Sequence, residues 1–307
     1  MTIEATAVLA STLRLGTPLI FAAMGGLVSE RSGIVNIGLE GLLLTGAFFA
    51  VVGSYFSGSA WVGVGVAVLA GSVLAAVHAV MCIRFGANQI ISGTAINLVA
   101  LGGTSYLLLQ TFGVPGSSPQ VHGFGDSPVP GLASIPVVGP ALFGQTWFVW
   151  AAPLCAVALW ALLGRTRLGL RIRASGEDPK ALEAAGVRVL PLRYAAVTAS
   201  GALCGVGGAH LSLGLLTAFS ENMTTGRGFI ALAAVIMGGW RPLRAMSAAL
   251  LFGFFEALVI RLPQELVAPQ FLQMVPYVAT IAVMVLFARG SLAPAGAGQD
   301  YRARSGR

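Results

Sequence analysis

The sequence predicts an all-α, polytopic membrane protein, and its composition is the main reason. The chain has 307 residues, of which 56% are hydrophobic and 9% charged, and its mean hydropathy is +0.84. A soluble chain of this length leaves much of its surface in water and could not hide that much apolar surface. The alternating segments of outer-membrane barrels are not visible, so we expect helices to cross the membrane.

The crossing helices follow from segment length, because about 20 apolar residues are needed to span the hydrocarbon core. This criterion predicts about nine transmembrane helices, with eight to ten as the range. The expected spans are 5–28, 34–55, 61–82, 90–110, 146–163, 194–216, 229–239, 245–260 and 271–288. Residues 1–290 then form a single transmembrane domain, and residues 291–307 form a flexible basic tail.

The positive charge predicts orientation rather than a nucleic-acid partner. The net charge is +7, and the arginines gather in a few short loops, as the positive-inside rule describes. The loop 164–193 and the C-terminus are therefore expected in the cytoplasm. The nearly uncharged loop 111–145 is expected outside. The clustering of the arginines therefore predicts the lipid bilayer, rather than a nucleic acid, as a partner.

Residues with catalytic or metal-binding chemistry form no recognisable site in the sequence. The three cysteines lie in apolar stretches without CxxC spacing, and the three histidines are scattered. No HExxH motif, paired aspartates or Ser/His/Asp grouping is present. We therefore expect no metal, no cofactor and no enzymatic activity, and a membrane-embedded enzyme is the least favoured class.

A polar cassette, defined as residues 165–193, interrupts the apolar chain with its only lysine and six arginines. Asp178 is a suitable N-cap, Pro179 fits the first helical position, and Gly186 supplies a left-handed stop. These signals predict a helix over about 179–185. Two turns are unstable alone in water, so the helix must pack on its own protein or seat in a cleft of a cytoplasmic partner.

Two glycine-interrupted segments, 32–46 and 224–240, differ from ordinary spans. Short, interrupted segments in the two halves of a transporter indicate the substrate path, although glycine also serves close packing between helices. Polar groups in or near these segments are candidates for lining the path. They are Asn36, Glu40, Asn97, Gly226 and Gly228.

Acidic residues within the spans are expected to have a functional or structural role, because placing a charge at the bilayer centre costs about 2.5–3.5 kcal/mol. Glu40 follows Asn36 by four residues, so both lie on one helical face. Glu40 either lines an aqueous path or pairs with Arg31 or another buried donor. Glu256 is the only acid in span 245–260, and a structural role is favoured for it.

Three motifs together resemble a known family. The segment GEDPKALEAAGV, at 176–187, resembles the cytoplasmic coupling loop of ABC-importer permeases for branched-chain amino acids, simple sugars and nucleosides. SERSGIVNIGLEGLLLTGAF, at 29–48, and ENMTTGRGFIALAAVIMGGWRPL, at 221–243, resemble signatures of the nucleoside, purine-type branch. The resemblance implies that the predicted short helix couples transport to ATP hydrolysis. The implied coupling residues are Gly176, Glu177, Asp178, Pro179, Lys180, Ala184 and Gly186.

The resemblance also implies partners and a location. Lys180 is not preceded by a glycine-rich loop, so no GxxxxGK[ST] motif is present and ATP must be hydrolysed by a separate subunit. The expected assembly contains two ABC ATPase subunits, a second permease of the same or related sequence, and an extracytoplasmic substrate-binding protein. It would lie in the plasma membrane of a prokaryote and import a small polar solute.

Nucleosides are the substrate that the motifs favour, with simple sugars and branched-chain amino acids as alternatives. A different class is an ion-coupled secondary transporter that uses Glu40 or Glu256 as a proton carrier. That class has no need of a docking element, so the cassette argues against it.

Overall fold

The computed structural model describes residues 2–125, 144–261, 293–299 and Tyr301, with isolated positions at 274, 278, 281 and 285. Over these residues the regular structure is helical, and the only β pairing there is an isolated bridge between Ser117 and Ser220. The predicted all-α class is therefore confirmed. Part of the predicted outer loop, residues 126–143, lies outside the described residues.

Seven of the described helices are long and apolar enough to cross a membrane. They are α1 (Thr2–Arg31), α2 (Leu39–Ser57), α3 (Ala60–Ala79), α4 (Gln89–Phe112), α5 (Trp147–Arg165), α8 (Val189–Ala209) and α10 (Pro242–Val259). Helices α3 and α8 continue as π-helical segments, Val80–Arg84 and His210–Leu216. Each of the seven corresponds to a span expected from the sequence.

The other two expected spans differ from these seven. Span 229–239 is α9 (Arg227–Met237), whose 11 residues reach about 16 Å and are too short to cross alone. Span 271–288 lies outside the described residues apart from isolated positions. The polar cassette holds two helices rather than one: α6 (Arg167–Glu177), which was not predicted, and α7 (Pro179–Ala184).

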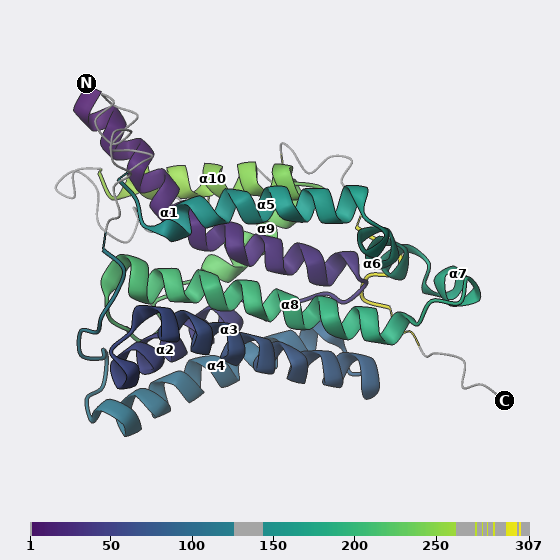
Figure 1. The fold of residues 1–307 in the computed structure, drawn as a ribbon, viewed down its shortest axis with the longest axis horizontal. Coiled ribbons are helices and arrows are strands. Elements are labelled where there is room, and N and C mark those ends of the chain that lie inside the picture. The colour runs from purple at the N-terminus through teal and green to yellow at the C-terminus, as the bar shows by residue number, and fades with distance from the viewer. Residues whose placement is uncertain are drawn as a thin grey trace.

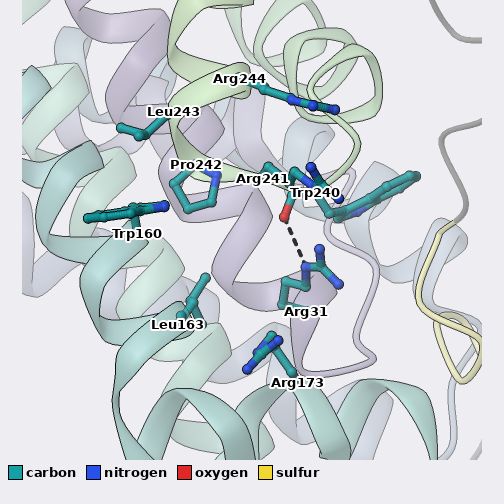
Figure 2. Close-up of a pocket in the computed structure, with 10 residues that line it drawn as sticks. Arg31, Trp160, Leu163, Arg173, Trp240, Arg241, Pro242, Leu243 and Arg244 are labelled. Carbon is teal, nitrogen blue, oxygen red and sulfur yellow. Dashed lines mark hydrogen bonds between the residues drawn. The ribbon is translucent and has the colours of Figure 1, made fainter.

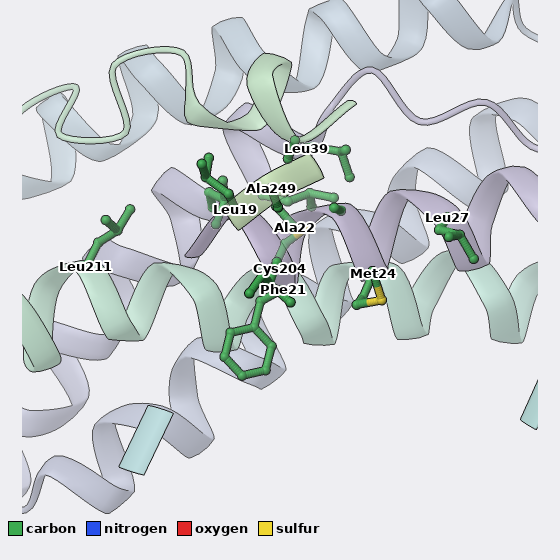
Figure 3. Packing of buried hydrophobic residues seen from close by; sticks show 14 of the residues in the cluster. Leu19, Phe21, Ala22, Met24, Leu27, Leu39, Cys204, Leu211 and Ala249 are labelled. Atoms are coloured by element: carbon green, nitrogen blue, oxygen red, sulfur yellow. The ribbon is translucent and has the colours of Figure 1, made fainter. Parts of the chain in front are cut away.

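The helices run along one long axis, and the cassette lies at one end of it (Figure 1). Helices α6 and α7 and the described residues 293–299 share that end, whereas α1 begins at the opposite end. Helix α2 is the most buried span, and α4 and α5 are among the most exposed. The core combines side chains of α1, α2, α8 and α10, including Leu19, Leu39 and Cys204 (Figure 3).

Glycines set the distance between α3 and α8. A Cβ added at Gly201 of α8 would lie 2.2 Å from the carbonyl oxygen of Gly71 on α3. A Cβ at Gly205 would lie 2.4 Å from the carbonyl oxygen of Ala67, one turn away on α3. Small residues allow helix backbones to approach this closely within a membrane. The backbones of the two helices therefore lie in close contact at these glycines.

Candidate functional site

The short helix of the cassette forms as its sequence predicts. Asp178 Oδ1 accepts the backbone N–H of Ala181 at 3.0 Å, and Pro179 occupies the first helical turn. Gly186 follows the helix with φ +78°, a left-handed conformation that favours glycine. The helix ends at Ala184, one residue before the expected end. Local capping is thus sufficient to define α7 at both ends.

Helix α7 presents a small-residue face away from the bundle. Leu182 is buried at 8% exposure and anchors the helix, whereas its exposed small residues are Ala181, Ala184 and Ala185. Lys180 and Gly186 are also exposed. In Figure 1, α7 projects at the end of the molecule beyond α6. Short side chains let another backbone approach closely, so this face suits a shallow cleft on a partner protein.

A buried arginine attaches the cassette to the bundle. Arg193 is 2% exposed, and its Nη2 donates to the carbonyl oxygen of Ser175 at 2.9 Å. Ser175 Oγ in turn donates to the carbonyl oxygen of Ser32 at 3.0 Å. Gly33 has φ +97°, and a Cβ there would lie 2.7 Å from Arg193 Nη2. Ser32, Gly33, Ser175 and Arg193 form what we call the cassette joint.

The joint has an outer ion pair. Arg31 Nη1 lies 3.7 Å from Glu177 Oε1, and the two side chains are 19% and 51% exposed. A pair this exposed is screened by solvent and contributes little to stability. The backbones of α6 and α1 are in closer contact nearby, because a Cβ at Gly176 would lie 2.4 Å from the carbonyl oxygen of Arg31. Only glycine allows α6 this close to the end of α1.

The described part of the C-terminal tail packs on the same joint. The N–H of Gly296 donates to the Gly176 carbonyl at 2.8 Å, and that of Ala295 donates to Glu177 Oε2 at 3.2 Å. The Tyr301 hydroxyl donates to Glu183 Oε2 at 2.6 Å. The Tyr301 ring also lies 5.3 Å from the guanidinium carbon of Arg193. The sequence predicted a flexible tail over 291–307, whereas residues 293–299 and Tyr301 make defined contacts.

Residues 32–38, which begin within the joint, are not helical and connect α1 to α2. This irregular backbone is largely buried, and protein side chains satisfy its polar groups. The N–H of Val35 donates to Gln89 Oε1 at 2.6 Å, and Ser29 Oγ donates to the Ile34 carbonyl at 2.8 Å. Irregular backbone at membrane depth is tolerated under this condition. The predicted glycine-interrupted character of 32–46 is therefore present at its start.

Asn36 and Asn97 stabilise that break. Asn36 is fully buried, its Nδ2 donates to Ser200 Oγ on α8 at 3.1 Å, and its Oδ1 accepts the N–H of Gly38 at 3.1 Å. Asn97 of α4 accepts the N–H of Gly41 at 2.8 Å and donates to the Ile37 carbonyl at 3.1 Å. Both amides thus replace backbone hydrogen bonds that the missing helical turn would have made.

Glu40 joins the two interrupted segments. Its Oε1 accepts the N–H of Gly226 at 2.7 Å, and its Oε2 accepts the N–H of Gly228 at 2.6 Å. These donors belong to the first turn of α9, where a carboxylate is favoured by the unsatisfied N–H groups and the helix dipole. A Cβ at Gly228 would lie 2.3 Å from the backbone nitrogen of Glu40. The alternative pairing of Glu40 with Arg31 is not formed.

We call Asn36, Glu40, Asn97, Gly226 and Gly228 the break node, since the structure brings all five together. Glu256 is not part of this node but pairs beside it, because its Oε2 lies 3.5 Å from Nη2 of Arg227, the residue between the two glycines. That ion pair agrees with the structural role favoured for Glu256. No cluster of three or more potential metal ligands occurs among the described residues.

Sequence reasoning missed Ser32, Ser175 and Tyr301 as site residues, and it assigned Arg193 only to the positive-inside charge. Single serines carry no periodic signal, and Tyr301 lies in a segment whose composition resembles a loose tail. The pairing of Ser175 with Ser32 joins positions 143 residues apart, which only the folded chain defines. The cassette joint and the break node share one stretch of chain, 32–40, which contributes Ser32 and Gly33 to the joint and Asn36 and Glu40 to the node.

Comparison with known proteins identifies relatives along nearly the whole chain. A family model described as "Branched-chain amino acid transport system / permease component" matches residues 8–285. The chain is 40% identical over 305 residues to the "Nucleoside ABC transporter permease protein NupC" of Lactococcus lactis subsp. cremoris (strain MG1363), covering 96% of each chain.

Two further relatives have nearly the same similarity. The chain is 38% identical to the "Guanosine ABC transporter permease protein NupQ" of Bacillus subtilis (strain 168), covering 95% of each. It is also 38% identical to the "Putative glucose ABC transporter permease protein TsgC13" of Haloferax volcanii, covering 91% of each. These relatives are therefore similar to the chain over nearly their full length, while their names differ in substrate.

Proposed function

The chain belongs to the branched-chain amino acid transport permease family and is the permease subunit of an ABC transporter, and from this premise we propose that it imports nucleosides. It is a multi-pass membrane protein and a transport subunit rather than an enzyme. The nucleoside proposal is supported by the names of two relatives at 40% and 38% identity. Glucose is the second candidate substrate, because one relative of equal identity is named for it.

The proposed assembly has the composition that the sequence predicts. Two ATPase subunits, a second permease and an extracytoplasmic substrate-binding protein would join this chain in the plasma membrane of a prokaryote. The end that carries α6 and α7 would face the cytoplasm, because the cassette is rich in arginine. The ATPases would then meet the exposed face of α7.

One observation carries the proposed coupling mechanism: the hydrogen bond from Ser175 Oγ to the Ser32 carbonyl. It connects the last turn of α6 directly to the irregular stretch that leads to Glu40. When the ATPases close and displace α7, α6 moves with it, and the joint pulls on residues 32–38. The break node would pass this movement to α9, because Glu40 holds the first turn of that helix.

The break node is proposed to border the translocation path rather than to bind the solute tightly. All five of its residues use a side chain or backbone group to hold the breaks: Asn36, Glu40 and Asn97 accept hydrogen bonds, and the backbone N–H groups of the two glycines donate them. Substrate choice would then rest with the binding protein. This division suits a path that must release its solute on each cycle.

The docking role of α7 is tested by changing Ala184. Ala184→Arg adds bulk and charge to the exposed face, and we expect it to abolish co-purification with the ATPase while the permease stays folded in the membrane. Ala184→Ser is the matched control and should retain the complex. Intact co-purification of Ala184→Arg would exclude α7 as the docking site.

The transport function is tested in vesicles reconstituted with the permeases, the ATPase and the binding protein. We expect guanosine or adenosine uptake that requires ATP and is not competed by glucose. Uptake that persists without ATP but with a proton gradient would instead establish a secondary transporter. Glucose uptake with no competition by nucleosides would establish the second candidate substrate.

A further inference from the structure

A cationic cavity lies between the end of α1, helices α5 and α6, and the start of α10 (Figure 2). Its volume is about 480 Å³. Four arginines line it, Arg31, Arg173, Arg241 and Arg244, and its walls include Trp160 and Trp240. None of the described residues that line it is acidic. In Figure 2 these arginines come from the end of α1, from α6 and from the start of α10.

Most of this positive charge has no counter-charge within the described part of the chain. Arg31 donates to the Trp240 carbonyl at 2.9 Å and pairs at 3.7 Å with Glu177, which is half exposed. No described carboxylate lies within 4.0 Å of Arg173, Arg241 or Arg244. Arg173 Nε is moreover buried without a hydrogen-bond partner. Buried donors are normally satisfied, so this guanidinium lacks an acceptor among the described residues.

The start of α10 adds a further attraction for an anion. This 18-residue helix begins at Pro242 beside Arg241, and its N-terminus has no side-chain cap. Its first N–H groups and the positive end of its dipole therefore remain available to a negative group. A phosphate bound here would neutralise arginine charges, and guanidinium groups bind phosphate oxygens in pairs.

An apolar strip on α5 indicates where that phosphate comes from. Leu154, Val157 and Trp160 are 67%, 47% and 38% exposed, and their spacing of three residues places them along one side of the helix. The strip ends at the cavity, since Trp160 belongs to both. Tryptophan at the end of a span is typical of the membrane interface.

We propose that this cavity binds the anionic head group of a phospholipid from the cytoplasmic leaflet, with an acyl chain lying along α5. Basic pockets between membrane helices on the cytoplasmic side have the chemistry to bind such head groups. The bound lipid would bridge α6 of the cassette to α10 and stabilise their relative position. This proposal does not depend on which solute is transported.

The test uses the full-length permease in detergent, titrated with phosphatidylglycerol or with phosphatidylcholine of the same acyl chains. We expect phosphatidylglycerol to raise the thermal unfolding temperature and to appear as a bound adduct in native mass spectrometry. Phosphatidylcholine should do neither. Equal stabilisation by both lipids would overturn an anion-specific site.

The cavity variant is Arg173→Gln with Arg244→Gln, and its matched control is Arg167→Gln with Arg171→Gln. The control changes the net charge equally at two exposed positions of α6. We expect the cavity variant to weaken phosphatidylglycerol binding by at least about tenfold, since each removed contact is charge-assisted. Equal weakening in both variants would mean diffuse surface attraction and would overturn the proposal.

Two further comparisons separate the remaining outcomes. Without lipid, the cavity variant should unfold at the same or a higher temperature than the unsubstituted protein, because it removes unpaired positive charge. A large loss of stability without lipid would show that these arginines are structural and would overturn the proposal.

Inorganic phosphate or glycerol phosphate should not reproduce the shift in unfolding temperature at the lipid's concentration. If either does, the site binds a soluble anion rather than a lipid.

Discussion

Glu40 places a buried carboxylate at the start of helix α9. Each carboxylate oxygen accepts one backbone N–H from the first turn of α9. The cost of placing a carboxylate within the membrane is thereby offset by donors that would otherwise be unsatisfied. The same bonds hold a helix that is too short to span the bilayer. Glu40 is therefore the residue whose loss should most directly release α9.

Replacing Glu40 by Gln tests this role. The amide keeps one acceptor but turns an N–H₂ group toward a backbone donor, so we expect a loss of about 1.5–3 kcal/mol and a lower unfolding temperature. Transport should fall with it. Glu221→Gln is the control, because Glu221 accepts only the Gly116 N–H at 3.1 Å in an exposed loop. Similar unfolding temperatures for the two variants would contradict the assignment.

Gly228 packs closely against the backbone of Glu40, and this packing can be tested by substitution. A Cβ at this position would lie 2.3 Å from the nitrogen and 2.5 Å from the Cα of Glu40, both backbone atoms that have little room to move. We expect Gly228→Ala to cost about 1–3 kcal/mol and to reduce uptake. Gly102→Ala on α4 meets no atom within 4 Å and should be neutral or slightly stabilising. Thermal unfolding of both variants distinguishes close packing from helix propensity.

Among the elements, α7 is the one that local sequence defines most completely. Its cap, its proline and its terminating glycine act within a few residues, so the expected range 179–185 differs from the observed one by a single residue. Helix α6 was missed because no equally clear stop or start marks it, apart from Thr166. The Thr166 hydroxyl accepts the Gly169 N–H at 3.0 Å and begins the helix. Burial of the Ile172 and Ser175 side chains then stabilises the helix.

Capping and charge at Asp178 are separable by two substitutions. Asp178→Asn keeps an oxygen acceptor for the Ala181 N–H, whereas Asp178→Ala removes it at a cost of about 1 kcal/mol to the helix. We expect ATPase binding to survive in Asp178→Asn and to weaken in Asp178→Ala, measured by co-purification. Loss of binding in both would instead assign the carboxylate charge to the interface.

For the whole molecule, the described tail residues pack against the end of α6 and the irregular stretch that follows α1. Gly298 donates its N–H to the Gly33 carbonyl at 3.3 Å, and Gly296 contacts Gly176. The tail therefore touches both sides of the joint that connects α6 to residues 32–38. Movement of the cassette during transport must either carry this tail along or detach it.

Tyr301→Phe tests how firmly the tail is docked. Removing the hydroxyl bond to Glu183 should cost about 1 kcal/mol and speed hydrogen exchange of the amides at 295–298 by about fivefold. Tyr106→Phe, at an exposed position of α4, should leave those rates unchanged. Unchanged exchange in Tyr301→Phe would mean that the backbone contacts alone hold the tail.

The same docking has a defined pH dependence. Partial burial and the neighbouring Glu183 carboxylate raise the pKa of Tyr301 from its ordinary value of 10.0 to about 12. A raised folded pKa means that the docked tail prefers the protonated phenol. Its contribution is therefore complete below pH 10 and is lost as the pH rises through about 12. Hydrogen exchange at 295–298, corrected for intrinsic rates, should show no added opening between pH 6 and pH 9.

The sequence by itself determined the membrane class, the two interrupted segments and the capped helix α7, and seven of its nine expected spans correspond to helices long and apolar enough to cross a membrane. These features depend on composition, segment length and contacts within a few residues, which are local quantities. It predicted that all five residues of the break node line a translocation path, without showing how they are bonded. Glu40 illustrates the difference, because its acidity was evident but its partners, the N–H groups of Gly226 and Gly228, were not.

Only the tertiary structure decided the long-range pairings: Ser175 with Ser32, Glu40 with α9, the tail with α7, and four arginines around one cavity. Each of these joins residues far apart in sequence, and each depends on how closely two backbones approach. That distance is set by packing of the whole bundle, through glycines such as Gly176 and Gly228. Hydrophobic pattern specifies which segments are buried, whereas the contacts between them are a property of the folded chain.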